Sequence, residues 1–162
     1  MFFDYPSRTF QLRELSRLLK MGLPSVINHV KALESEGFVQ SENAGTYKGY
    51  AASGNDRFRL YRRNDMILRL HETGFVEALV DEFAPDAIVL FGSASRGEDV
   101  EESDIDVLVV AKEHETDVRK FEGSLKRKVN LQFEPDLTGI PKELLNNIAN
   151  GIVLYGYLRC FE

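Results

Sequence analysis

Cysteine is nearly absent from this sequence, whose 162 residues contain only Cys160. A single thiol excludes an intramolecular disulfide and a cysteine-based zinc site, and we interpret it as a buried or inert side chain. Long apolar runs are also missing, so the sequence predicts no membrane-spanning helix and no membrane partner. The first residues lack the basic start and apolar stretch of a signal peptide, and we expect a cytoplasmic location.

The composition is that of a globular protein, with 43% hydrophobic and 28% charged residues. The charge is shared unevenly along the chain. Residues 1–63 carry a net charge of +4, and residues 64–162 carry −10. This asymmetry predicts two domains with different partners, one at 1–63 and one at 64–162.

The first domain has the pattern of two helices and a hairpin. Apolar residues at helical spacing predict helices over 11–20 and 24–36, separated by Gly22. Alternation from Phe38 predicts a strand, and a loop over about 43–56 then leads to a second predicted strand over 57–61. Two helices joined by a tight glycine turn form a helix-turn-helix, and the hairpin would add a wing.

This pattern resembles the winged helix-turn-helix domains of prokaryotic transcription regulators, over about 9–61. The resemblance implies DNA binding, with the second helix in the major groove, the wing near phosphates, and a homodimer on paired half-sites. Asn28 is the best candidate for reading a base, because its amide can pair with adenine. The full set of DNA-binding candidates is Ser25, Asn28, His29, Lys31, Lys48, Arg57 and Arg59. The alternative is a domain for protein contact or dimerisation.

The second domain is expected to begin with a helix from Asn64 to Phe83, with Gly74 as a possible break. Further along, the pattern predicts helices over 113–127 and 141–150 and strands over 128–134 and 152–155.

The pattern predicts two buried strands over the apolar segments 87–91 and 104–110. The most informative part of the chain lies at and between them. The first ends in Gly92 and Ser93. The second begins with Asp104 and Asp106, which the period of two places on one face. Paired carboxylates on an apolar strand repel one another unless a cation lies between them, and they are the ligands that Mg²⁺ takes.

The turn between these strands has the residues of a phosphate site. Gly92 and Gly97 allow close backbone approach, the Ser93 hydroxyl can donate to phosphate oxygens, and Arg96 adds a positive charge. Each feature alone is compatible with an ordinary turn and solvated charges. Their joint spacing on two apolar strands favours a nucleoside triphosphate site.

These motifs resemble those of the minimal nucleotidyltransferases of the DNA polymerase beta superfamily, over about 86–162. The match consists of Gly92-Ser93, Arg96-Gly97 and Ser103-Asp104-Ile105-Asp106. The resemblance implies an α+β fold with a mixed sheet, in which Asp104 and Asp106 are catalytic and bind Mg²⁺. It implies nucleotide binding by the turn, and our candidates are Gly92, Ser93, Arg96, Gly97 and Ser103.

The family has a third acidic residue on a later strand, and here that position falls on Asn130. A neutral amide can neither hold a second cation by charge nor accept a proton. Glu134 lies on the same face but roughly 13 Å away along the strand, too far to substitute.

Three functional hypotheses follow. The first is a Mg²⁺-dependent nucleotidyltransferase that transfers a nucleoside monophosphate, for example from ATP, to an acceptor hydroxyl. The second is a DNA-binding regulator or antitoxin whose nucleotidyltransferase-like domain is weak or inactive. The third rests on the resemblance alone: transfer of AMP to a HEPN-type toxin partner, with repression of the operon by the winged helix.

Overall fold

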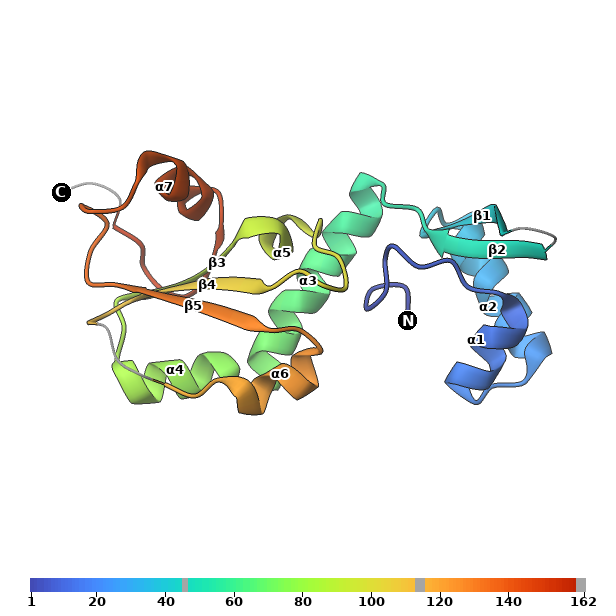
Figure 1. Ribbon diagram of the computed structural model, residues 1–162, viewed down its shortest axis with the longest axis horizontal. Helices are drawn as coiled ribbons and strands as arrows, with labels where there is room; N and C mark the ends of the chain where they lie inside the picture. Colours follow the sequence, from blue (N-terminus) through green and yellow to red (C-terminus); the bar gives the residue numbers. More distant parts are fainter. Residues whose placement is uncertain (45–46, 113–115, 160–162) are drawn as a thin grey trace. The chain divides into compact units, whose positions relative to one another are not determined.

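The computed structural model describes residues 1–44, 47–112 and 116–159 (Figure 1). The chain divides into an N-terminal unit, Met1–Tyr61, and a C-terminal unit, Arg62–Glu162. The sequence places this boundary two residues later. Among the described residues, no helix has the length and apolar character needed to cross a bilayer. Cys160 lies outside the described residues.

The N-terminal unit contains two helices and a hairpin. Helices α1 (Leu12–Leu19) and α2 (Leu23–Ser35) agree with the predicted helices to within one residue at each end. Strands β1 (Val39–Ala44) and β2 (Tyr47–Ala52) pair antiparallel, and an isolated bridge joins Phe10 to Tyr50. The core lies between the helices and the hairpin and contains Phe10, Leu15, Val26, Val30, Val39 and Tyr50.

The predicted loop over 43–56 and the predicted strand over 57–61 are both wrong. β2 lies within the expected loop, and 57–61 belong to helix α3 (Asp56–Glu72). The side-chain oxygen of Asn55 accepts a hydrogen bond of 2.8 Å from the Phe58 amide and thereby caps the helix. Phe58, Met66 and Leu70 are all buried and recur at multiples of four residues. This helical spacing, rather than the local alternation of arginine and apolar residues, determines the secondary structure.

The predicted helix from Asn64 to Phe83 is therefore wrong at its start, but its break is confirmed. α3 ends at Glu72, and α4 covers Phe75–Phe83. Gly74 lies between them with φ of 74°, a left-handed conformation that glycine adopts without steric cost.

The C-terminal unit is built on a four-stranded mixed sheet, as predicted. The strands are β3 (Ala87–Phe91), β4 (Ile105–Val110), β5 (Val129–Glu134) and β6 (Ile152–Gly156). Their order is β5-β4-β3-β6; β3 runs antiparallel to both β4 and β6, and β4 runs parallel to β5. The helices between strands are α5 (Gly92–Arg96), α6 (Arg119–Leu125) and α7 (Lys142–Ala149).

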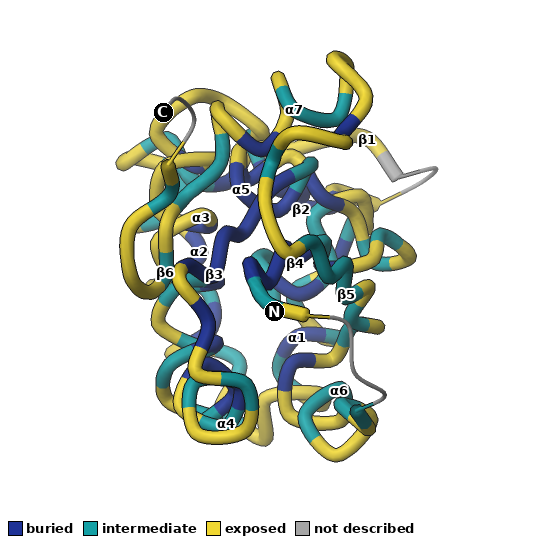
Figure 2. Tube along the Cα trace, turned by 90° about the vertical axis from the view of Figure 1, so that its left-hand side faces the viewer, coloured by how far each residue is buried: buried dark blue, intermediate teal, exposed yellow. Residues whose placement is uncertain are grey.

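Helices cover both faces of this sheet. α3, α4 and α6 lie on one face and α7 on the other (Figure 1). β3 is buried along its whole length (Figure 2), and its alternate residues enter the two cores. Full burial of an Ile or Leu side chain contributes about 1.5–3 kcal/mol, so Ile88 and Leu90 make β3 a rigid support for the turn that follows.

The predicted helix over 113–127 is shorter in the structure. Residues 113–115 lie outside the described residues, 116–118 are not helical, and α6 begins at Arg119. The Asp117 carboxylate accepts hydrogen bonds from both the backbone and the guanidinium of Arg119. This local bonding favours a turn over a further helical residue.

Candidate active site

The centre of the candidate site is the close approach of Gly92 to Asp106. β3 delivers Gly92 at its end, where φ is 71°, and the pairing of Phe91 with Asp106 brings the aspartate alongside. A Cβ atom on Gly92 would overlap Oδ2 of Asp106 and lie 3.3 Å from its Cγ. Glycine is therefore required here by both the backbone conformation and the space left by the carboxylate.

The Gly-Ser turn (Gly92–Ser93) opens the short helix α5. The Ser93 side chain is half-buried, and its hydroxyl makes no hydrogen bond with any described residue. Ser95 is buried and donates a hydrogen bond of 2.8 Å to the Gly92 carbonyl, which fixes the turn. No pattern in the sequence predicts this role for Ser95. The Ser93 hydroxyl is thus available to a ligand, whereas that of Ser95 is part of the turn.

The remaining predicted phosphate ligands have partners within the protein. The Gly97 amide donates to the Ala94 carbonyl at 3.2 Å and closes α5 with φ of 69°. The Arg96 guanidinium forms an exposed ion pair with Glu98, with 2.8 Å between Nε and Oε2. The Ser103 hydroxyl accepts a hydrogen bond of 2.9 Å from the Val100 amide. These three residues shape the turn and the following loop.

Asp104 and Asp106 lie at the start of β4. Asp104 is exposed, and Asp106 is half-buried on the face of the sheet that also carries Leu108 and Val110. The amide of Ile105 donates a hydrogen bond of 2.8 Å to the Lys128 carbonyl, which anchors this end of β4 to the beginning of β5.

Asn130 lies directly beside Asp106. The two residues are register partners in the parallel pair of β4 and β5. The Asn130 side chain donates a hydrogen bond of 3.0 Å from Nδ2 to Oδ1 of Asp106. Glu134 pairs with Val110 at the other end of the strand, and its carboxylate accepts a hydrogen bond from Gln132. Asp106 therefore has a neutral amide where a third carboxylate would lie.

The acidic residues fit one divalent cation better than two. No group of three or more His, Cys, Asp or Glu side chains in the described part of the chain could hold a metal ion. Two carboxylates are nevertheless sufficient for Mg²⁺, which completes its shell with water and substrate phosphates. Asp104 and Asp106 fit that role. Asn130 adds no charge to the site because its amide is neutral, and its Nδ2 donates to Asp106.

An open groove of about 740 Å³ borders Asp104. It lies between the loop ahead of β4 and the turn from α6 to β5. Basic side chains from that turn contribute to its wall together with acidic ones, and the lining residues are Glu101, Glu102, Ser103, Asp104, Glu122, Gly123, Lys126, Arg127 and Lys128. The groove leaves Asp104 accessible to solvent from this side.

A buried ion cluster that the sequence did not predict supports the site. Arg62 on α3 donates hydrogen bonds to the Asp99 carbonyl and, at 2.7 Å, to its carboxylate. Nε of Arg127 lies 4.0 Å from the same carboxylate. Burial raises the pKa of the Asp99 carboxyl, and the two guanidinium groups oppose this rise. The only feature of the sequence that could have indicated this cluster is the position of Arg62 among the apolar residues of α3.

The predicted DNA-binding residues are distributed over three elements. Ser25, Asn28, His29 and Lys31 are all exposed on α2, and Lys48 is exposed on β2. Arg57 and Arg59 are not in the hairpin, because both belong to α3. Arg57 donates a hydrogen bond of 2.9 Å to the Glu36 carbonyl and lies over the Phe38 ring. The prediction of two wing arginines is therefore wrong.

Comparison with known proteins identifies the family of the domain that contains this geometry. A search of curated proteins found no match for the chain. A family model described as the nucleotidyltransferase domain matches residues 73–154, just over half of the sequence. The matched segment begins just before α4 and includes the Gly-Ser turn, both aspartates and Asn130. The chain belongs to the nucleotidyltransferase domain family.

Proposed function

We propose that the C-terminal unit transfers a nucleoside monophosphate from a nucleoside triphosphate to an acceptor hydroxyl in a Mg²⁺-dependent reaction. The observation that carries this proposal is the contact of Gly92 with the Asp106 carboxylate. It brings the proposed phosphate-binding turn next to Asp106, one of the two proposed metal ligands. In this arrangement the Ser93 hydroxyl donates to the triphosphate, and Asp104 and Asp106 hold the cation.

In the proposed reaction, the acceptor oxygen forms a bond to the α-phosphorus while the bond from that phosphorus to the bridging oxygen breaks. Pyrophosphate leaves, and the hydroxyl proton passes to solvent. Bound Mg²⁺ would neutralise charge on the phosphates. The residues of the chain mainly position the two reactants, and this orientation accounts for most of the expected acceleration.

A second candidate function is nucleotide binding with little or no turnover. The hydrogen bond from Asn130 to Asp106 favours it, because the residue beside the metal ligand cannot accept a proton. General-base assistance contributes about 10²–10⁴ to a rate, so its absence is compatible with a slow enzyme or a sensor.

We further propose that the N-terminal unit is a winged helix that binds DNA through α2. Its support is the exposed polar surface of that helix, centred on Asn28 and flanked by Ser25 and Lys31. The bridge between Phe10 and Tyr50 adds a short third pairing to the hairpin. Lys48 remains a candidate phosphate contact on the wing, although it also lies 3.7 Å from a Glu34 oxygen.

Calorimetric titration of ATP, with Mg²⁺ or with a chelator, tests the nucleotide site. Wild type should bind ATP only with Mg²⁺, and Asp104→Ala combined with Asp106→Ala should abolish binding. Glu72→Ala combined with Asp81→Ala is the matched control, since it removes the same charge from exposed positions on α3 and α4. Unchanged affinity in the aspartate variant contradicts the proposed site.

Pyrophosphate release with candidate acceptors then separates the two functions. Turnover that requires both aspartates supports the transferase, and Mg²⁺-dependent binding without release supports the sensor.

DNA binding is tested by fluorescence anisotropy with duplex DNA over a range of salt concentrations. Lys31→Ala should weaken binding and reduce the salt slope by about one. Lys142→Ala removes the same charge from an exposed position on α7 and should leave both quantities unchanged. Equal effects of the two substitutions contradict binding through α2.

A further inference from the structure

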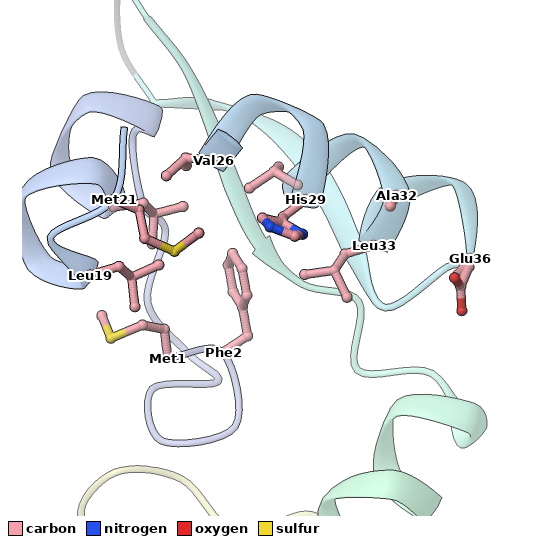
Figure 3. A pocket seen from close by; sticks show the side chains of 11 residues that line it. Met1, Phe2, Leu19, Met21, Val26, His29, Ala32, Leu33 and Glu36 are labelled. Atoms are coloured by element: carbon pink, nitrogen blue, oxygen red, sulfur yellow. The ribbon is translucent and has the colours of Figure 1, made fainter. Parts of the chain in front are cut away.

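The N-terminal unit contains an apolar cavity that neither proposed activity uses. Its volume is about 430 Å³, and it lies between α1, α2 and the first residues of the chain (Figure 3). The Phe2 ring and the side chains of Leu19 and Met21 form the side opposite α2. Small-molecule sites have volumes of about 300–1,000 Å³ and mainly apolar walls, and this cavity has both properties.

The wall formed by the first residues is held in place by the fold. The Phe2 ring packs edge-on against buried Phe10 with 5.6 Å between ring centroids. The Met1 carbonyl accepts hydrogen bonds from the amides of Asp4 and Tyr5. The cavity is therefore preformed. The side chains of Met1 and Met21 in its wall can adapt to the shape of an occupant.

The polar groups of the cavity indicate the charge of its ligand. His29 on α2 and Glu36, the residue that caps the end of α2, are the only titratable side chains among the residues that line it. The Glu36 carboxylate lies 3.5 Å from Nη2 of Arg57, and this exposed ion pair balances part of its charge. An anionic ligand would lie close to this carboxylate, and a cationic one would compete with Arg57. The imidazole of His29 remains as a hydrogen-bonding group for a neutral molecule.

We propose that this cavity binds a small, uncharged, mainly apolar molecule with one polar group that faces His29. The inference depends on neither the nucleotidyltransferase reaction nor DNA binding, and its failure would leave both unaffected. The ligand is defined by chemistry: an aromatic or aliphatic body for the walls of α1 and α2 and one hydrogen-bonding group for the imidazole.

Two adjacent leucines on α1 provide a matched test. Leu19 lines the cavity and is 42% exposed, whereas Leu18 does not line it and is 51% exposed. The probe is the neutral fluorophore N-phenyl-1-naphthylamine, titrated into the whole chain. Wild type should bind it saturably, and Leu19→Glu should weaken binding at least about tenfold because a carboxylate in an apolar cavity is costly. Leu18→Glu should leave the affinity unchanged.

A second variant and a measurement of mass complete the test. Ala32→Glu introduces a carboxylate from α2 at an exposed lining position and should also prevent binding. Circular dichroism establishes that each variant is folded. The proposal is overturned if wild type shows no saturable fluorescence, or if Leu19→Glu binds as wild type does. It is also overturned if light scattering finds a dimer that both leucine variants dissociate and the probe binds only the monomer, because a second copy then occupies the cavity.

Discussion

The candidate site has two halves that meet at Asp106 and differ in chemistry. On the β3 side, Gly92 contacts the carboxylate and Ser93 offers a hydroxyl that no described residue engages. On the β5 side, the neighbour of the same carboxylate is the amide of Asn130. The first half has the groups that we propose to hold a triphosphate with its cation. The second half lacks the group that would hold another cation or accept a proton.

Under the proposed function, this difference assigns nucleotide binding to the β3 half and turnover to the β5 half. The geometry of the β3 half depends on the left-handed backbone conformation at position 92, where only glycine fits beside the Asp106 carboxylate. The β5 half depends on a single side chain at a position whose register is fixed by strand pairing. Substitutions on either side should therefore change different quantities: nucleotide affinity on the β3 side, and metal stoichiometry or rate on the β5 side.

The largest effect, on the free energy of unfolding, is expected from substitution of Asp99. Its buried cluster with Arg62 and Arg127 connects the loop after α5 with the turn that leads to β5. Asp99 accepts hydrogen bonds from Arg62 and lies beside Arg127 in the turn that leads to β5. Asp99→Ala leaves guanidinium groups buried without their carboxylate and should lower the free energy of unfolding by about 3–5 kcal/mol. Urea unfolding measures this change. The exposed neighbour Glu102 is the control, and Glu102→Ala should cost less than about 0.5 kcal/mol.

The next effect concerns the β5 half. Asn130→Asp places a third carboxylate beside Asp106, and we expect bound Mn²⁺ to rise from about one to about two per chain with a non-hydrolysable ATP analogue. Electron paramagnetic resonance of free Mn²⁺ gives the stoichiometry. Gln132→Glu adds the same charge on the same face of β5, opposite Leu108, and should leave the stoichiometry at its wild-type value. The same Mn²⁺ stoichiometry in Asn130→Asp and Gln132→Glu would mean that the net charge of the sheet face, rather than a ligand beside Asp106, controls Mn²⁺ binding.

Gly92→Ala tests the β3 half. A left-handed conformation costs a non-glycine residue about 1–2 kcal/mol, and the new methyl group would also displace the Asp106 carboxylate. Gly74→Ala is a close control, since its φ of 74° imposes the same strain and no atom lies within 4 Å of the added Cβ. Thermal unfolding should register a cost in both variants. Only Gly92→Ala should lose ATP affinity, by at least about tenfold, and equal losses would refute the steric argument.

The smallest effect is expected for Ser93→Ala. Loss of one hydrogen bond to a charged phosphate should weaken ATP binding by about 1.5 kcal/mol, roughly tenfold. Stability without nucleotide should not change, because the hydroxyl makes no hydrogen bond with the described residues. Calorimetry and thermal unfolding on the same samples separate these quantities. Unchanged affinity would remove Ser93 from the site.

Much of the C-terminal unit could be predicted because its chemistry lies at fixed spacing on apolar strands. The strands and the turn after β3 follow from apolar runs with a period of two and from the Gly-Ser pair that ends the first of them. The position of Asn130 follows from the family resemblance, and the pairing of β4 with β5 places it beside Asp106. The Asp99 cluster could not be predicted, since its partner Arg62 lies 37 residues away in sequence. Contacts of this kind depend on tertiary packing. The local pattern of apolar and polar residues does not indicate which distant residues will meet.

The error at 57–61 has a different physical cause. Arginine alternates with Phe58 and Leu60 there, and this local alternation is typical of a strand. The helical spacing of Phe58, Met66 and Leu70 extends over a longer stretch and determines the structure. The Asn55 cap was a usable signal, because asparagine is a preferred residue at the start of a helix.

The hydrogen bond from Asn130 to Asp106 also affects the protein when no nucleotide is present. Three adjacent carboxylates would repel one another in a metal-free domain, and the fold would bear that cost whenever Mg²⁺ or nucleotide was scarce. With an amide at this position the carboxylate gains a donor and one source of repulsion is absent. Under the proposed function, this one side chain would lower catalytic capacity while it favours a domain that stays folded without nucleotide or Mg²⁺.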